Sequence, residues 1–175
     1  MFNINVISSS NTLIEQACSN SRLRFKLRIC IQILESHQQI ISANNFYDLS
    51  IAIMQSGISS STNTRTHVKN LLKEPTLGPN LKDALQDCKS AYNGIILAFN
   101  MALNEVRGKE YDGATYDLLI GSTDGFKRCL NDVAAGKIKD SMILSGNDVA
   151  LIYAFSAYQA IDSITSKSQP RGQIN

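Results

Sequence analysis

Four cysteines are the most reactive side chains of this sequence, and their spacing limits what they can form. Cys18, Cys30, Cys88 and Cys129 include no C-x-x-C pair of the kind that zinc sites and redox motifs use. Because the chain has only two histidines, no Cys/His metal cluster fits these spacings either. Two disulfides would indicate an oxidising, extracellular compartment, whereas four free thiols would fit the cytosol, and composition leaves both open. We expect no metal site and no cofactor.

The other candidate catalytic groups are isolated. His37 and His67 lie outside any motif that would pair them with a nucleophile, so we interpret them as surface or helix-face residues. Asp83 and Asp87 are four residues apart, which is typical of a solvated helix face. No nucleotide-binding, esterase or zinc-protease motif occurs. Residues 22–28 (RLRFKLR) are typical of a solvated turn, with contact to an acidic partner or polyanion as the alternative. The sequence therefore predicts a protein that is not an enzyme.

Composition indicates one folded domain. The chain has 175 residues, of which 43% are hydrophobic and 18% are charged, enough for a sizeable core. Its 17 Lys+Arg and 15 Asp+Glu give a net charge of +2, too balanced for a dedicated nucleic-acid binder. The apolar stretch 149–161 is shorter than the ~20 residues of a membrane span. Residues 1–10 lack the basic start of a signal peptide, so we expect that a leader has been removed or that none exists.

Helical periodicity predicts the elements. A helix is predicted over 79–108, where apolar residues recur at alternating steps of four and three. A second is predicted over 46–72, either broken at the hydroxyl-rich stretch 56–66 or, as we favour, continuous. A third should run over 111–133, and a fourth should begin near Ser145 or Asn147. Two short helices are predicted at 11–17 and 29–34.

These elements predict an all-α fold: an up-down-up-down four-helix bundle with an N-terminal α-helical hairpin. The domain would span 11–165, with the hairpin at 11–40 and the bundle at 44–165. Residues 1–10 would form a flexible segment and residues 166–175 a disordered tail.

Helix heights predict one disulfide. Cys88 lies 20 residues before Gly108 and Cys129 lies 21 after it, so antiparallel helices joined there place both at the same height. This favours a Cys88–Cys129 bridge, after which Cys18 and Cys30 would close the hairpin. The alternative is two unpaired core cysteines at the same height by chance.

The sequence also resembles a known family. Residues 79–92 match the run P-x-L-K-x-x-L-x-x-C-x-x-x-Y of the plant invertase and pectin methylesterase inhibitors, and LIEQAC before and including Cys18 is similar to their start. The resemblance implies the same bundle and the sequential pairing Cys18–Cys30 and Cys88–Cys129. It also implies a secreted protein of the apoplast or cell wall, monomeric when free, that binds a carbohydrate-active enzyme non-covalently in a one-to-one complex.

The resemblance leaves the target enzyme to be chosen. Inhibitors of cell-wall or vacuolar acid invertase share a Pro-Lys-Phe motif entering the third bundle helix, where this chain has Lys109, Glu110 and Tyr111. We therefore expect an inhibitor that covers the active-site cleft of pectin methylesterase. The alternatives are an invertase inhibitor and a non-inhibitory pollen or structural member of the family. We expect no nucleic-acid or membrane partner. The predicted contact residues are Ser59, Ser60, Thr62, Asn63, Thr66, Lys109, Glu110 and Tyr111.

Overall fold

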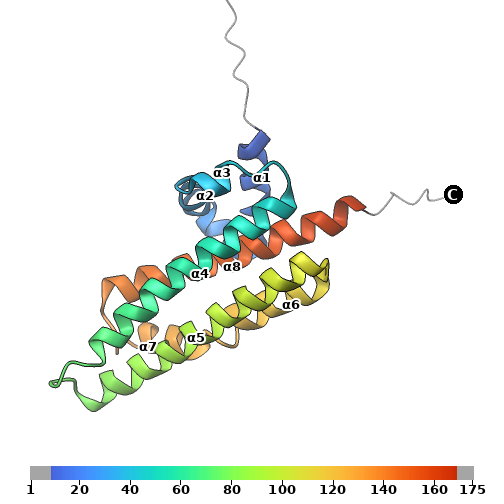
Figure 1. Cartoon of the computed structure of the whole chain (residues 1–175). Helices are drawn as coiled ribbons and strands as arrows, with labels where there is room; N and C mark the ends of the chain where they lie inside the picture. The colour runs from blue at the N-terminus through green and yellow to red at the C-terminus, as the bar shows by residue number, and fades with distance from the viewer. Residues whose placement is uncertain (1–8, 169–175) are drawn as a thin grey trace, which may run out of the picture.

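The chain folds into helices joined by short connections (Figure 1). The computed structural model describes residues 9–168, and within that range it contains no β-strand. The elements are α1 (Ser9–Ala17), the 3₁₀ helix η1 (Ser21–Lys26), α2 (Leu27–Glu35), α3 (Gln38–Ile41), α4 (Phe46–Leu71), α5 (Pro79–Gly108), α6 (Tyr111–Ser122), α7 (Lys127–Ala134) and α8 (Ser141–Ser168).

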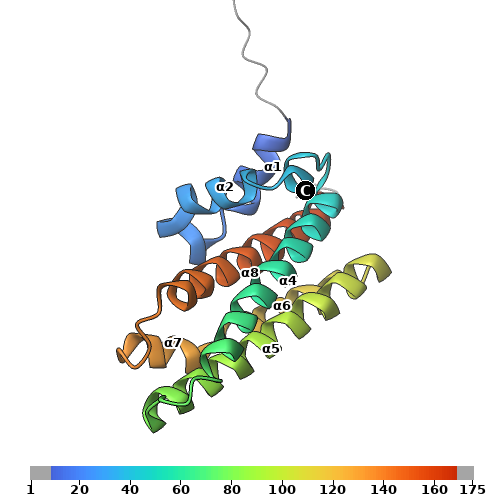
Figure 2. The same cartoon turned by 60° about the vertical axis from the view of Figure 1, so that its left-hand side comes forward.

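Helices α4, α5, α6 and α8 form an antiparallel four-helix bundle. The long helix α4 packs against α5 on one side and α8 on the other, and α6 packs against α5 and α8 to complete the ring. The segment α1–α3 lies across α4 and α8, away from α5 and α6 (Figures 1 and 2). The predicted four-helix bundle with an N-terminal hairpin is thereby confirmed.

Helix α4 is continuous through its hydroxyl-rich middle, as favoured above. The side chain of Asn45 starts it by accepting a hydrogen bond from the backbone N–H of Asp48 at 2.8 Å. Small residues in the middle of α4 face the core, where Gly57 lies directly against the ring of Phe99. Packing against α5 and α8 therefore compensates for the poor helix propensity of residues 56–66.

The prediction of one helix over 111–133 was wrong. Helix α6 ends at Ser122, and α7 begins at Lys127 after a turn. In this turn Phe126 is fully buried and packs edge-on against Tyr92, with ring centroids 5.1 Å apart. Burying this aromatic ring outweighs the hydrogen bonds of an unbroken helix, and Gly125 makes the break easier because glycine is a weak helix former.

The start of the last helix was also predicted wrongly. Helix α8 begins at Ser141, before the predicted Ser145 or Asn147, because Asp140 caps it. The Asp140 carboxylate accepts a hydrogen bond from the backbone N–H of Ile143 at 3.0 Å. At its other end α8 continues to Ser168, so its last residues fall in the tail expected to be disordered from residue 166. Residues 1–8 and 169–175 of the two predicted terminal segments lie outside the described residues.

Both predicted disulfides are present. Cys18–Cys30 joins α1 to α2 with the two Cα atoms 5.8 Å apart, and Cys88–Cys129 joins α5 to α7 with a Cα separation of 4.4 Å. All four cysteines are buried. By restricting the unfolded chain, bridges of this length contribute about 3–4 kcal/mol each.

Candidate functional site

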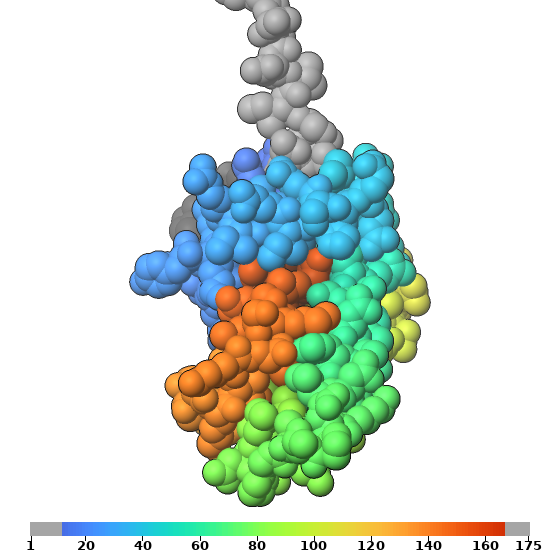
Figure 3. Space-filling view, turned by 90° about the vertical axis from the view of Figure 1, so that its left-hand side faces the viewer, coloured from blue at the N-terminus to red at the C-terminus, as the bar shows by residue number. Residues whose placement is uncertain are grey.

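A polar hollow of about 290 Å³ lies where the N-terminal segment meets α4 and α8. Figure 3 shows this face, with the N-terminal segment in blue above α4 in green and α8 in orange. We use the term polar hollow for the residues that line it: His37, Gln39, Ser56, Ser59, Ser60, Asn63 and Tyr153. Three of these, Ser59, Ser60 and Asn63, are predicted contact residues.

Two hydrogen bonds fix the inner wall of the polar hollow. The Gln39 amide donates to the Ser56 hydroxyl at 2.8 Å, and the Tyr153 hydroxyl lies 2.6 Å from Nε2 of His37. Burial raises the pKa of Tyr153 to about 12, so the phenol keeps its proton. These four side chains are thus held by one another, which leaves Ser59, Ser60 and Asn63 for a partner.

The outer edge of the polar hollow continues into a row of exposed side chains on α4. We call Ser59, Asn63 and Thr66 the exposed stripe of α4, while Ser60 and Thr62 beside them are half-buried. Thr66 and Thr62 lie outside the polar hollow, and the Thr66 hydroxyl donates to the backbone carbonyl of Thr62 at 2.8 Å. These five predicted residues therefore all lie in the C-terminal half of α4, with hydroxyl and amide groups on its outward side.

The other three predicted residues form a separate site. Lys109, Glu110 and Tyr111 make the α5–α6 turn and line a hollow of about 250 Å³ with Asp112, Gly113 and Thr165. This turn (yellow in Figure 1) lies at the end of the bundle where α4 begins, and Ser59 is roughly 20 Å further along α4. The structure does not bring the two predicted groups together.

The α5–α6 turn has a left-handed backbone. Lys109 has φ of 65°, and its N–H donates to the Val106 carbonyl at 3.1 Å, while the N–H of Glu110 donates to the Glu105 carbonyl at 2.8 Å. This is the normal way to satisfy the last carbonyls of a helix, here with a lysine at the position where glycine is usual.

A carboxyl pair lies close behind this turn. Glu105 of α5 and Asp117 of α6 each keep one buried carboxyl oxygen without a hydrogen-bond partner. Burial raises the pKa of Glu105, and the negative charges of Asp117 and Glu110 raise it further. Burial and the nearby negative charges therefore favour the protonated form of Glu105.

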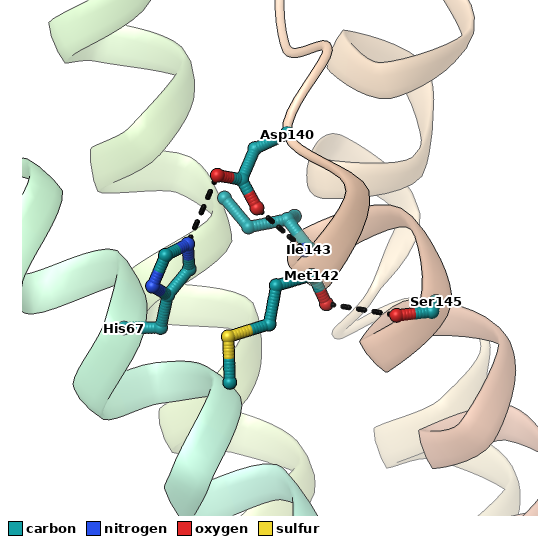
Figure 4. Close-up of polar contacts among 5 residues, drawn as sticks. All are labelled: His67, Asp140, Met142, Ile143 and Ser145. Atoms are coloured by element: carbon teal, nitrogen blue, oxygen red, sulfur yellow. Dashed lines mark hydrogen bonds and ion pairs between the residues drawn. The ribbon is translucent and has the colours of Figure 1, made fainter.

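His67 has a structural partner near the opposite end of the bundle (Figure 4). Its Nε2 lies 2.9 Å from the Asp140 carboxylate, which links α4 to the capped start of α8. Burial raises the pKa of Asp140, but the hydrogen bonds from His67 and from the N–H of Ile143 outweigh it and lower that pKa below its usual value. This agrees with the interpretation of His67 as a histidine on a helix face.

Four residues of the polar hollow were not predicted from the sequence. His37, Gln39 and Ser56 carry no motif, and Tyr153 lies 116 residues after the histidine that it contacts. No local sequence pattern indicates that these four residues lie side by side. Within residues 12–166, no cluster of His, Cys, Asp or Glu side chains is arranged to hold a metal ion. Among the described helices, none combines the length and apolarity needed to cross a membrane.

The comparison with known families gives a match over most of the domain. Residues 12–151 match the family described as plant invertase/pectin methylesterase inhibitor. The chain belongs to this family. No protein with curated annotation matches the chain in sequence.

Solved structures of inhibitors share the family fold. A mutant form of a pectin methylesterase inhibitor from Arabidopsis superimposes with a TM-score of 0.73 at 17% identity, covering 89% of this chain and 96% of the other. A pectin methylesterase inhibitor from Arabidopsis thaliana gives a TM-score of 0.63 at 18% identity, covering 78% and 87%. At these identities the likeness concerns the fold.

Proposed function

We propose that this protein inhibits a plant pectin methylesterase by covering its active-site cleft in a non-covalent, one-to-one complex. Family membership supports an inhibitor of pectin methylesterase or invertase. The choice between these two targets rests on one observation, the backbone of the α5–α6 turn.

The turn is incompatible with the motif that marks the invertase branch. In the resemblance described above, the proline of Pro-Lys-Phe corresponds to Lys109. Proline fixes φ near −65° and has no N–H, whereas Lys109 has φ of 65° and donates its N–H to Val106. A proline here would require a differently built turn, which favours pectin methylesterase over invertase.

The proposed contact surface is the polar hollow with the exposed stripe of α4. A stable one-to-one complex buries about 800 Å² per partner, a small part of the total surface of 10,383 Å². Hydroxyl and amide groups at Ser59, Asn63 and Thr66 can exchange hydrogen bonds with an enzyme cleft that is built for a carbohydrate. The pair of buried disulfides fits a secreted protein of the cell wall.

The test is titration of the purified protein against a plant pectin methylesterase and an acid invertase. We expect inhibition of the first enzyme, with one equivalent giving full effect. Inhibition of invertase alone would contradict the proposal. Inhibition of neither enzyme at micromolar protein would indicate a non-inhibitory member of the family.

A pair of variants tests the contact surface. Ser59→Arg/Asn63→Arg places two large cations at the edge of the polar hollow and should weaken inhibition at least about tenfold. The matched control, Gln16→Arg/Gln32→Arg, adds the same charge at exposed positions of α1 and α2 and should inhibit like the parent. Equal inhibition by both variants would indicate that the contact surface lies elsewhere on the bundle.

A further inference from the structure

The segment RLRFKLR forms most of η1 and the start of α2. From sequence it was interpreted as a solvated turn, with contact to an acidic partner or polyanion as the alternative. Leu23 is buried and anchors it, but Phe25 is 85% exposed, the highest value among the exposed large apolar side chains of the described residues. Leu27 and Ile29 follow at 43% and 50% exposure. Three large apolar side chains exposed within five residues form a patch of the kind that marks an interaction site.

The cations around Phe25 are held in place but are mostly not neutralised. Lys26 forms an ion pair with Asp148 of α8. The guanidinium of Arg24 lies 4.5 Å from the centroid of the Phe25 ring, and that of Arg22 lies 5.2 Å from the ring of Phe155. Within the described part of the chain, no carboxylate forms an ion pair with Arg22, Arg24 or the exposed Arg28.

We call Arg22, Arg24, Phe25 and Arg28 the arginine patch. Residues 1–43 contain four Lys+Arg and two Asp+Glu, so this part of the chain carries the whole net charge of +2 and the rest is balanced. The charge asymmetry therefore coincides with the exposed aromatic ring. Both lie on the N-terminal segment, part of which projects beyond the outline of the bundle in Figure 3.

We propose that the arginine patch binds a polyuronate, the carboxylated polymer that remains when the methyl esters of pectin are hydrolysed. The proposal rests on the proposed function, because the polymer is chosen as the product of the target enzyme. Arginine pairs with carboxylates through two parallel hydrogen bonds. The apolar face of a sugar ring stacks on an exposed aromatic ring, which Phe25 supplies between Arg24 and Arg28.

The arrangement fits a polymer better than a membrane. A segment that lies in a membrane surface separates an apolar face from a cationic face. Here the three-residue period of η1 places Arg22 and Phe25 on the same side, and the Arg24 guanidinium lies 4.5 Å from the centroid of the Phe25 ring. Cations therefore lie beside the aromatic ring, as a chain that carries carboxylates on its sugar rings requires.

The experiment measures binding of the full chain to polygalacturonate and to a fully methyl-esterified chain of the same length. We expect binding to the first polymer, little binding to the second, and weaker binding as salt is added. Arg24→Gln/Arg28→Gln should weaken binding about tenfold, because each lost guanidinium removes a charge-assisted hydrogen-bonded pair. The control Lys69→Gln/Lys127→Gln removes the same charge from exposed positions elsewhere and should change affinity less than about twofold. Phe25→Ala should also weaken binding, with the salt dependence unchanged.

Three results would overturn the proposal: equal binding of the two polymers, equal losses in the two double variants, or binding to anionic phospholipid vesicles without binding to polygalacturonate. The last would assign the arginine patch to a lipid surface. Inhibition is measured separately on a short soluble methyl ester, where Arg24→Gln/Arg28→Gln should inhibit like the parent. A parent that binds the polymer but inhibits no esterase would refute only the proposed function, and the reverse result would refute only this inference.

Discussion

Replacing Gly121 with alanine is expected to destabilise the bundle, although the same substitution normally stabilises a helix. A Cβ atom at Gly121 of α6 would lie 2.4 Å from the Cβ of Ala98 on α5. Carbon atoms pack best at about 3.5 Å or more, so the two helices would have to separate by about 1 Å. Such overpacking costs about 3 kcal/mol at the upper end of its range. Since alanine recovers about 1 kcal/mol of helix propensity, we expect a net loss of about 2 kcal/mol.

The matched control is Gly94→Ala on α5. Gly94 also lies inside a helix, but a Cβ there would have no neighbouring atom within 4 Å. This variant gains the propensity without the clash, so it should be more stable than the parent by up to about 1 kcal/mol. The pair therefore isolates the effect of the α5–α6 contact.

The assay is thermal and urea unfolding under non-reducing conditions. For a chain of this size, Gly121→Ala should lower Tm by about 4–8 °C and Gly94→Ala should raise it by about 2–4 °C. Ala98→Gly removes the clashing Cβ, so Ala98→Gly/Gly121→Ala should recover most of the overpacking cost in a double-mutant cycle. A neutral or stabilising Gly121→Ala, or no coupling to Ala98→Gly, would refute the close α5–α6 approach.

Three further changes test the bridge and the charged pairs. Cys129→Ser opens the bundle disulfide and should cost about 2–5 kcal/mol in non-reducing urea unfolding; an unchanged midpoint would mean that the bridge contributes nothing. Glu105→Gln should stabilise the fold at neutral pH by up to about 1 kcal/mol, because it removes repulsion from Asp117. The folded-state pKa of Glu105 is raised, so the stability that its protonated form contributes is present below its unfolded pKa and is lost as pH rises, and the advantage of the variant should vanish in acid. Asp140→Ala should cost about 1 kcal/mol at neutral pH by removing the α8 cap and the contact with His67. The folded-state pKa of Asp140 is lowered, so its contribution is lost as pH falls through that pKa, and denaturation curves that stay apart in acid would contradict this account.

The long helices could be predicted because each keeps one apolar face over many turns. The pattern from Leu81 to Val106 predicted α5, and the residue counts on either side of Gly108 predicted the bridge between Cys88 and Cys129. Counting residues works here because helix rise is constant, so sequence distance from a turn converts directly to height. The break between α6 and α7 changes the height of Cys129 so little that it still meets Cys88.

The two errors in helix boundaries have different causes. The apolar line over 111–133 is a valid helix pattern, but burial of Phe126 against Tyr92 interrupts it. The early start of α8 follows from the Asp140 cap, a local signal that lies before the apolar stripe of the helix. Boundaries depend on single side chains, whereas the existence of a helix depends on a whole face.

The candidate site could be predicted only in part. The hydroxyl of Ser59 and the amide of Asn63 on α4 followed from composition, but their neighbours His37 and Tyr153 come from chain segments that share no sequence signal. The distance between the α4 stripe and Lys109 also depends on how the helices run past one another. Periodicity and spacing within the helices were enough for the helical class and the Cys88–Cys129 bridge, whereas the family and the pairing of Cys18 with Cys30 followed from the resemblance. The polar hollow and the exposed arginine patch arise only when separate helices pack, since packing determines which side chains are covered and which are left to meet a partner.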